Sequence, residues 1–196
     1  MQYLSTDPNP RGEICYQGNS IFHGYFKNEE KTREALSQDG WLASGDVGMI
    51  MPNGSIKIID RAKNIFKLAQ GEYIAPEKLE NVYIQSPYVA QVFVHGESTE
   101  AWLMAVCVIE KAEIKKLAIE KGWTDGEDIK PELLLKPELH KAILDNFNDL
   151  AKANKLSGLE KIKKLHLTDE LFSVENDILT PTFKIKRNVA KNAFKA

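Results

Sequence analysis

Apolar and polar residues alternate in short runs through the first 60 positions, a pattern typical of β-strands separated by turns. The extended segments predicted there are residues 12–16 and 20–25, followed by a hairpin of residues 47–51 and 55–59. Asn53-Gly54, between the hairpin strands, tolerates the positive φ of a tight turn. A helix is predicted over residues 29–36, because Asn28 is a suitable N-cap and acids occupy the first turn. The glycine-rich residues 45–48 are predicted to be a loop or a strand edge.

Beyond residue 61, strand and helix patterns alternate along the chain. The predicted order is a small hairpin or loop around residues 69–71, a helix over 76–85, strands over 89–96 and 102–109, a helix over 111–121, a polar linker over 122–136, an amphipathic helix over 137–154 and a strand over 162–167. Pro76 suits the first helical position, where its missing N–H costs nothing. This order is typical of a compact α+β domain of about 130 residues.

Composition and charge indicate a soluble intracellular protein. The net charge of −2 argues against a nucleic-acid binder, which would normally be basic. Cys15 and Cys107 lie among apolar residues and are predicted to be two buried thiols in a reducing compartment. No apolar run approaches the about 20 residues of a membrane span, and no signal peptide is evident. The chain enters a strand with no pocket before it, so we expect a piece of a larger enzyme.

The sequence contains no motif of a self-contained active site. It lacks HExxH, paired CxxC, GxSxG, GxGxxG and a Walker lysine loop. The four histidines are scattered, and each is expected to be a surface or core imidazole: His23, His95, His140 and His166.

Three residues near the middle of the chain could contact a ligand, and each also has an ordinary structural explanation. Asp46, between two glycines, could chelate a vicinal diol, but spacing alone favours a turn aspartate bonded to its own backbone. Arg61 could bind a phosphate or sugar, or form a surface ion pair with Asp60 or a neighbouring acid. Gly71 could be a turn glycine, or could let the chain lie against a substrate.

A basic stretch without an acid, PTFKIKRNVAKNAFK, lies near the C-terminus. Its basic residues are Lys184, Lys186, Arg187, Lys191 and Lys195. A solvated tail is the simplest interpretation, and an electrostatic contact with an anionic membrane surface is a weaker alternative.

These segments together resemble the adenylate-forming superfamily of acyl-CoA synthetases, luciferases and peptide-synthetase adenylation domains. The resemblance lies in GWLASGDVG and IIDRAKNIFKLAQGEYIAPEKLE, and it covers the chain from about Gly12 to the end. KLAQGEYIAPEKLE and LTPTFKIKR look like the eukaryotic-type long-chain acyl-CoA synthetases, or long-chain-fatty-acid–CoA ligases. Ala43-Ser44 departs from the His-Thr that is common before Gly-Asp in the family.

The resemblance implies a reaction in two steps. A carboxylate and ATP form an acyl-adenylate and pyrophosphate, and the acyl group then moves to the thiol of CoA. Asp46 matches the aspartate that holds the ribose hydroxyls of the adenylate. Arg61 matches an arginine on the ribose or phosphate side, and Ile58 would lie near the nucleoside. Lys184 matches the mobile catalytic lysine of the first step, and it aligns better than Lys186.

The resemblance also implies a mobile C-terminal domain. Residues 1–61 would be the β-rich end of the large domain's β-subdomain, and residues 62–196 a compact α+β lid with a small mixed sheet flanked by helices. Lys63 falls at the hinge about which the lid rotates between the two steps. Gly71, Glu72 and Tyr73 would then line the path of the pantetheine arm of CoA.

The implied cofactors are ATP, Mg²⁺ and CoA, with a fatty acid as substrate, the missing N-terminal domain as partner and no nucleic acid. The family's phosphate loop, metal-binding glutamate and acyl tunnel do not occur in these 196 residues, so we expect no metal ligand here and no activity from the chain alone. The expected location is the cytoplasm, or a peripheral position on the cytosolic face of the endoplasmic reticulum, mitochondria or another organelle. Two alternatives stay open: a synthetase for another carboxylic acid, and a non-catalytic binding or regulatory module derived from the lid.

Overall fold

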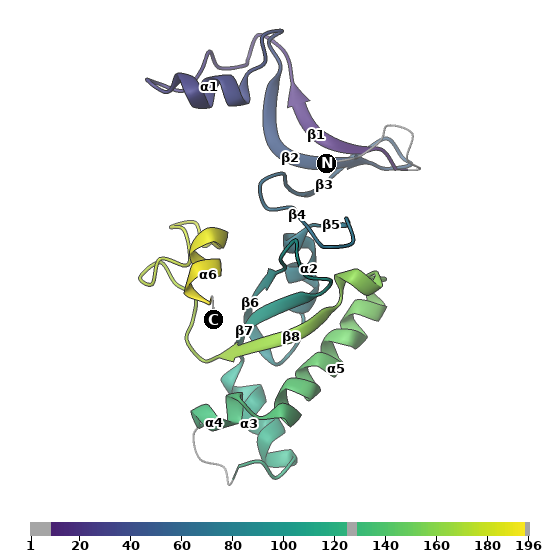
Figure 1. Ribbon diagram of the computed structural model, residues 1–196, viewed down its shortest axis with the longest axis vertical. Coiled ribbons are helices and arrows are strands. Elements are labelled where there is room, and N and C mark those ends of the chain that lie inside the picture. Colours follow the sequence, from purple (N-terminus) through teal and green to yellow (C-terminus); the bar gives the residue numbers. More distant parts are fainter. Residues whose placement is uncertain (1–8, 125–128, 195–196) are drawn as a thin grey trace. The chain divides into compact units, whose positions relative to one another are not determined.

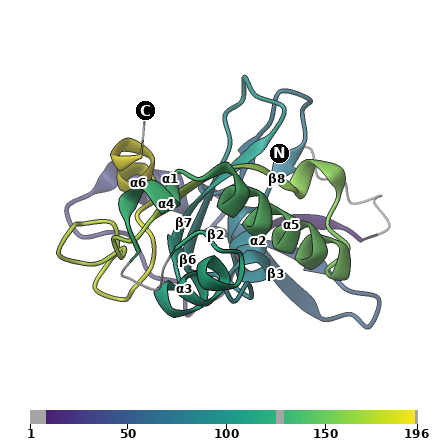
Figure 2. The same cartoon turned by 90° about the horizontal axis from the view of Figure 1, so that it is seen from below.

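A computed structural model describes residues 9–124 and 129–194. The chain divides into two compact units, Met1–Ile65 (unit 1) and Phe66–Ala196 (unit 2), whose elements are labelled in Figures 1 and 2. The mixture of helices and small sheets confirms the predicted α+β class. The division follows Ile65, whereas the family resemblance put the boundary of the moving domain after Arg61; that boundary remains a prediction.

Unit 1 is built on a three-stranded antiparallel sheet in the order β1-β2-β3. Its elements are β1 (Arg11–Tyr16), α1 (Glu29–Ala35), β2 (Leu42–Ile50) and β3 (Ile56–Arg61). The predicted first strand and the Asn-Gly hairpin are confirmed. The predicted helix is also confirmed, and it begins as expected because the Asn28 side chain accepts a hydrogen bond from Lys31 N at 3.0 Å.

Two predictions for unit 1 are wrong. Residues 20–25 form no strand, because the chain there is irregular and Ile21 N bonds back to Gly18 O at 3.2 Å. Residues 45–48 lie inside β2, the central strand, rather than in a loop or at a strand edge. Val47 and Gly48 pair with both β1 and β3, whereas residues 44–46 form a bulge where the β1–β2 register shifts between Glu13 and Cys15. Gly45 accommodates it with a φ of 75°, and a register shift follows Val47 in the pairing with β3.

Unit 2 combines a two-stranded and a three-stranded sheet with helices. Its elements are β4 (Phe66–Lys67), β5 (Tyr73–Ile74), α2 (Pro76–Tyr83), β6 (Val89–His95), β7 (Leu103–Ile109), α3 (Lys111–Glu120), α4 (Pro131–Leu134), α5 (Pro137–Ala153), the 3-10 turn η1 (Gly158–Glu160), β8 (Ile162–Thr168) and α6 (Arg187–Ala193). β4 pairs antiparallel with β5, β6 pairs antiparallel with β7, and β7 pairs parallel with β8. The predicted small hairpin, strands and three longer helices of this part are confirmed.

Both faces of the β6-β7-β8 sheet are covered, since successive residues of a strand point to opposite faces. Ala105 and Cys107 of β7 belong to the main core, which they share with apolar residues of α2, α3, α4 and α5. Val106 and Val108 belong to a second cluster with the C-terminal segment, including Ala190 of α6. In Figure 1, α5 and α6 accordingly lie on different sides of the sheet.

The C-terminal half of unit 2 corrects two further predictions. Residues 131–134 of the predicted linker form α4, because Leu133 and Leu134 are buried in the main core. The predicted solvated tail forms α6, and Ala190 is fully buried. Bases of the tail pair with acids distant in sequence, as Lys186–Asp177, Arg187–Glu80 and Lys191–Glu97. Lys195 lies outside the described residues.

The two cysteines differ in environment. Cys107 is buried in the centre of the sheet, and burial raises the pKa of its thiol. Cys15 is exposed, so the prediction of two buried thiols is wrong for it: β1 is an edge strand, and its alternate residues face solvent. In the part of the chain that is described, the helices are too short or too polar to cross a membrane.

Glu97, just after β6, gives a pH-dependent contact with α6. Its carboxylate accepts bonds from Lys191 Nζ at 2.6 Å and from His95 Nε2 at 2.9 Å, and these lower the pKa of Glu97 to about 2. A folded-state pKa below the ordinary value means that the contact stabilises the fold above about pH 4.5 and is lost as the pH falls towards 2.

We therefore expect Lys191→Ala to raise the pKa of Glu97. Because this ion pair is exposed, the free energy of unfolding near neutral pH should fall by only about 0.5 kcal/mol. The difference between the two proteins should vanish towards pH 2. Denaturant unfolding across this range, with an NMR titration of Glu97, measures both effects; an unchanged pKa would contradict the contact.

Candidate functional site

Asp46 and Arg61 meet on neighbouring strands of unit 1. They are directly opposite in the register of β2 and β3, and Arg61 Nε lies 2.9 Å from Asp46 Oδ1. The side chains are 58% exposed for Arg61 and 32% for Asp46, so a ligand can reach both. A carboxylate and a guanidinium side by side offer two acceptor oxygens for hydroxyl groups and a fork of donors for a phosphate.

The local backbone keeps Asp46 aimed outward from a central strand. Asp46 N donates to Ser44 Oγ at 3.0 Å, and Gly45 N donates to Glu13 Oε1 at 2.9 Å. Asp46 is therefore a strand residue paired with Arg61, and the sequence-based interpretation of a turn aspartate does not describe it. Arg61 does form an ion pair, as its ordinary explanation required, but with Asp46.

Asp60 has a different role from its neighbour. Its side chain is buried, and its Oδ1 accepts bonds from Arg61 N at 2.6 Å and Asn64 Nδ2 at 3.3 Å. These bonds fix the chain where β3 ends. Ile58, two residues earlier, is 56% exposed, and an apolar side chain at that exposure can pack on a planar ligand.

Lys63 lies in the short turn after β3. Asn64 N and Ile65 N both donate to Arg61 O, at 3.0 and 3.2 Å, and Lys63 itself is exposed. Unit 1 ends two residues later, at Ile65. A turn of this length between two compact units is a suitable place for a hinge.

The loop between β4 and β5 carries Gly71 and Glu72, and Tyr73 begins β5. Gly71 has a φ of 91°, which strains any residue with a Cβ, and Gly71 N donates to Leu68 O at 2.9 Å. Glu72 is exposed, and Lys67 Nζ lies 5.6 Å from the centroid of the Tyr73 ring. The glycine therefore has a turn role whether or not a ligand lies against it.

Lys184 follows a tight turn of unit 2. Phe183 N donates to Thr180 O at 2.8 Å, Thr180 N donates to Lys184 O at 2.8 Å, and Lys184 N donates to Thr180 Oγ1 at 3.1 Å. Phe183 has a left-handed φ of 58° and is 77% exposed. The lysine is exposed, and no acid pairs with it within residues 9–124 and 129–194. The turn thus offers a rigidly held backbone and a free ammonium group.

Sequence reasoning gave Glu80 no role and gave Arg187 no partner. Glu80 of α2 and Arg187 of α6 form a bidentate ion pair, although they are 107 positions apart. The run from Pro76 to Tyr83 gives no sign that Glu80 is buried. The tail contains bases and no acids, so an ion-pair partner for Arg187 has to come from elsewhere in the chain. That imbalance was the one sign of this contact in the sequence.

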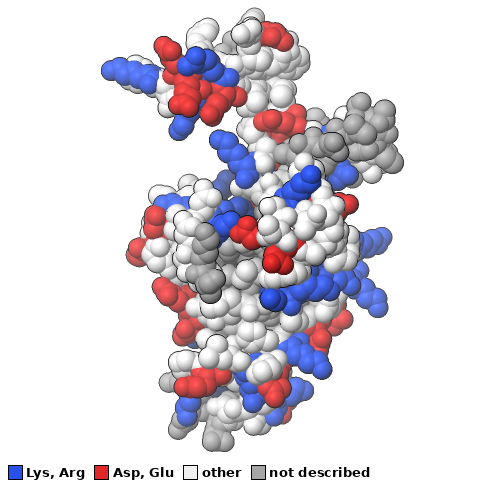
Figure 3. All heavy atoms as spheres, viewed as in Figure 1, with Lys and Arg blue, Asp and Glu red and all other residues white. Residues whose placement is uncertain are grey.

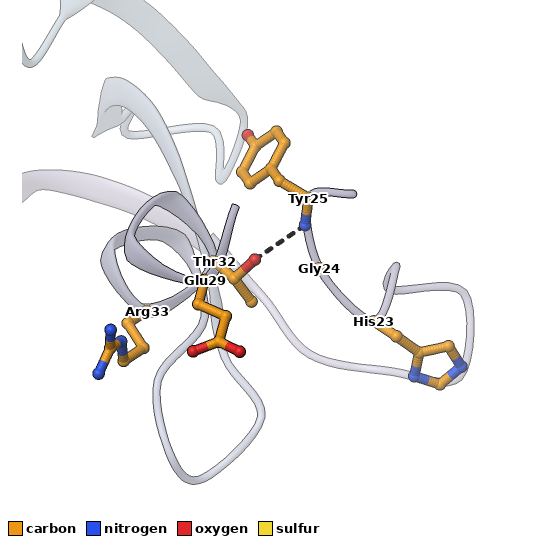
Figure 4. A pocket seen from close by; sticks show the side chains of 6 residues that line it. All are labelled: His23, Gly24, Tyr25, Glu29, Thr32 and Arg33. Atoms are coloured by element: carbon orange, nitrogen blue, oxygen red, sulfur yellow. Dashed lines mark hydrogen bonds between the residues drawn. The ribbon is translucent and has the colours of Figure 1, made fainter. Parts of the chain in front are cut away.

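A separate cavity lies beside α1 and includes none of the predicted site residues. Its volume is about 500 Å³, and the residues that line it are His23, Gly24, Tyr25, Glu29, Thr32 and Arg33. Figure 4 shows these side chains around it, with the bond of 2.9 Å from Tyr25 N to Thr32 Oγ1. Gly24 is required there, because a Cβ would lie 2.7 Å from Thr32 Cγ2.

Charge and metal-binding groups add little to the candidate site. Figure 3 shows both signs of charge across the face that it presents. Within the described residues, no three His, Cys, Asp or Glu side chains gather as metal ligands would.

Comparison with known proteins explains the motifs. No protein-family profile matches the chain. It is 49% identical over 199 residues to "Long chain acyl-CoA synthetase 7, peroxisomal" of Arabidopsis thaliana and 47% identical over 196 residues to human "Long-chain-fatty-acid--CoA ligase 1". These alignments cover 99% and 100% of this chain, but only 28% and 27% of the two relatives.

Solved structures agree with this similarity. The adenylation domain of the carboxylate reductase from Mycobacterium chelonae superposes with a TM-score of 0.83 at 32% identity, over 98% of this chain and 28% of that one. The A-PCP didomain of the carboxylic acid reductase from Segniliparus rugosus, in complex with AMP, gives 0.82 at 32% identity, over 98% and 25%. The chain therefore matches the C-terminal portion of long-chain acyl-CoA synthetases in sequence, and in fold it matches the adenylation domains of the adenylate-forming superfamily.

Proposed function

We propose that this chain acts as the C-terminal part of an ATP-dependent long-chain-fatty-acid–CoA ligase. The observation that carries the proposal is similarity at 47–49% identity over 99–100% of the chain to relatives named for this activity. Because the chain spans only 27–28% of those relatives, the activity is proposed for the whole protein that contains it. ATP, a fatty acid and CoA are its proposed substrates, and a large adenylate-forming domain is its proposed partner.

Asp46 and Arg61 are the proposed nucleotide contacts. The Asp46 carboxylate would accept bonds from the two ribose hydroxyls, and Arg61 would orient that carboxylate while reaching the ribose or phosphate side. Their separation of 2.9 Å and their exposure support this role. Ile58 would contact the nucleoside through its exposed side chain.

Lys184 is the proposed catalytic residue of the adenylation step. As the fatty-acid carboxylate attacks the α-phosphate, negative charge grows on the oxygens around phosphorus. A preorganised ammonium group next to them stabilises that charge more than it stabilises bound ATP, which lowers the barrier. The exposed, unpaired lysine on a well-bonded turn supports this role.

The second step uses another face of unit 2. We infer that unit 2 rotates about the turn at Lys63 after adenylation. This rotation would move Lys184 away from the acyl-adenylate and bring the β4–β5 loop towards it. Gly71, Glu72 and Tyr73 would then border the pantetheine arm of CoA, whose sulfur attacks the acyl carbon and releases AMP. Short turns that absorb a large dihedral change are the usual hinges of such motions.

The two other functions remain distinguishable from this one. A synthetase for another carboxylic acid would share every residue named above, because the proposed acid pocket lies outside this chain. A non-catalytic module would need neither the free Lys184 nor the Asp46–Arg61 pair. Two plant relatives are named peroxisomal, so peroxisomes join the cytoplasm and other organelle surfaces as proposed locations.

The experiment that tests the proposal is fatty-acid-dependent release of pyrophosphate. It compares the chain alone, the chain mixed with the large domain of the human relative, and a chimera in which the chain replaces the matching portion of that relative. We expect release in the mixture or the chimera and none from the chain alone. A folded chimera that releases no pyrophosphate would overturn the proposal.

Asp46→Asn in this chimera should raise the KM for ATP about tenfold, since a lost hydrogen bond to a charged group contributes about 1.5 kcal/mol. Stability should hardly change, because an exposed ion pair contributes about 0–1 kcal/mol. ATP–pyrophosphate exchange gives the KM, and thermal unfolding gives the stability. Asp39→Asn, the same change at an exposed aspartate of unit 1, is the control. Equal KM values for the two variants would rule out the ribose contact.

A further inference from the structure

Glu80 and Arg187 form a bidentate ion pair inside unit 2. Arg187 Nη1 donates to Glu80 Oε1 at 3.0 Å, and Nη2 donates to Oε2 at 2.6 Å. The two side chains are only 17% exposed for Arg187 and 13% for Glu80. Two parallel bonds between planar groups fix orientation as well as distance, which a single lysine–carboxylate contact cannot do.

The same pair forms hydrogen bonds with the backbone of Val94 in the edge strand β6. β6 is the outer strand of its sheet, and Val94 N donates to Glu80 Oε1 at 2.8 Å. Val94 O accepts from Arg187 Nη1 at 3.5 Å, and the guanidinium carbon lies 5.7 Å from the centroid of the Phe93 ring. Burial raises the pKa of Glu80, while Arg187 acts in the opposite direction. Removing Arg187 would leave the Glu80 carboxyl group, whose side chain is 13% exposed, without its cation.

Arg187 also ends the hairpin that carries Lys184. Leu179 and Ile185 pair as a bridge, and Lys186 N donates to Ile178 O at 2.8 Å. Arg187 comes directly after this segment and begins α6. Its bonds to Glu80 therefore join the Lys184 hairpin to α2 and to the edge of β6, whereas Lys184 itself extends from the exposed end of the turn.

We propose that Glu80 and Arg187 are a positioning pair that holds Lys184 in place for adenylation. The proposal rests on the function proposed above. Neither residue is expected to touch ATP or the fatty acid; each acts through the backbone that leads to Lys184. Since misplacement of a catalytic group by about 1 Å can cost about 10²-fold in rate, a loosened hairpin should slow the first step in particular.

The test measures the two half-reactions separately in the chimera. Arg187→Ala should lower kcat for adenylate formation by roughly 10- to 100-fold, in the range expected for a misplaced group. Acyl transfer from preformed acyl-adenylate to CoA should change little, because that step does not use Lys184. Arg187→Lys keeps the positive charge but cannot form the two parallel bonds of the guanidinium group. Its adenylation rate should therefore lie between those of the parent and the alanine variant. Glu80→Gln keeps the acceptor for Val94 N and should fall in the same intermediate range.

Lys191→Ala is the matched control, because it breaks the ion pair of α6 with Glu97 and leaves the positioning pair intact. Its adenylation rate should equal that of the parent. Combining Arg187→Lys with Glu80→Gln should cost less than the product of the single effects, since both act on one contact. If Arg187→Ala does not fold, Arg187→Lys and Glu80→Gln still test the proposal.

Three results would overturn the inference. These are equal losses in both half-reactions for the folded variants, an adenylation rate unchanged by Arg187→Lys and Glu80→Gln, or the same loss in Lys191→Ala. A parent chimera inactive in both half-reactions would instead overturn the proposed function. An active parent that loses adenylation on Lys184→Ala but not on Arg187→Ala would overturn only the positioning pair.

Discussion

Replacing Lys184 by alanine should lower the rate of adenylate formation roughly 10²–10³-fold, the usual loss when one preorganised charge-stabilising group is removed. Its ammonium is exposed and has no acid partner within the described residues, so nothing in unit 2 neutralises it before ATP binds. The change should leave stability almost unaffected, because the turn is held by backbone and Thr180 bonds rather than by the lysine side chain.

The measurement pairs two assays on the same chimera. Fatty-acid-dependent pyrophosphate release reports the first step, and CoA-dependent consumption of preformed acyl-adenylate reports the second. Lys186→Ala is the control, since it removes a nearby lysine that is already paired with Asp177. Loss of both steps to the same extent in Lys184→Ala would refute its assignment to adenylation.

Replacing Lys63 by proline should slow overall turnover while sparing each half-reaction. Proline fixes φ at position 63 and disfavours the helical φ and ψ values at Ala62. A domain orientation that needs the excluded backbone angles at either position is therefore penalised by about 3 kcal/mol. A penalty of that size on the interconversion corresponds to about 10²-fold in rate. Within the described residues the Lys63 amide donates to no backbone carbonyl, so proline breaks no backbone–backbone hydrogen bond of this turn.

Lys63→Ala is the control for this experiment, because it removes the side chain and keeps the backbone freedom. Steady-state formation of acyl-CoA is compared with the two single-step assays in both variants. Turnover by Lys63→Pro equal to that of Lys63→Ala would argue against a hinge at this turn.

Local signals in the sequence predicted the pieces of unit 1 that carry the Asp46–Arg61 pair. Asn53-Gly54 indicated the hairpin and the register near its turn. A register shift after Val47, which no sequence pattern indicated, then places Asp46 opposite Arg61. The glycines on either side of Asp46 misled the local assignment, because the segment lies in the central strand β2, with a bulge at Gly45 and pairing to both β1 and β3 from Val47 onward. Pairing partners distant in sequence decided the outcome, and no local pattern reports them.

The C-terminal tail illustrates the same limit more strongly. Its bases and lack of acids are those of a solvated segment, yet Arg187 is only 17% exposed where it pairs with Glu80, and Ala190 is buried in the second cluster. The acids that pair with it come from α2 and from the loop after β6. The family resemblance suggested the proposed role of Lys184, and only the three-dimensional arrangement revealed the Glu80–Arg187 contact next to its hairpin.

The central claim is that this chain completes a long-chain-fatty-acid–CoA ligase. Its most direct test is acyl-CoA formation from a long-chain fatty acid, ATP and CoA by the chimera with the human relative. We predict turnover within about 10²-fold of the human parent, the loss that a 1 Å misfit at the new junction would cause. Lys184→Ala in the same chimera should reduce it further. A folded chimera that forms no acyl-CoA, or whose turnover is unaffected by Lys184→Ala, would contradict the account.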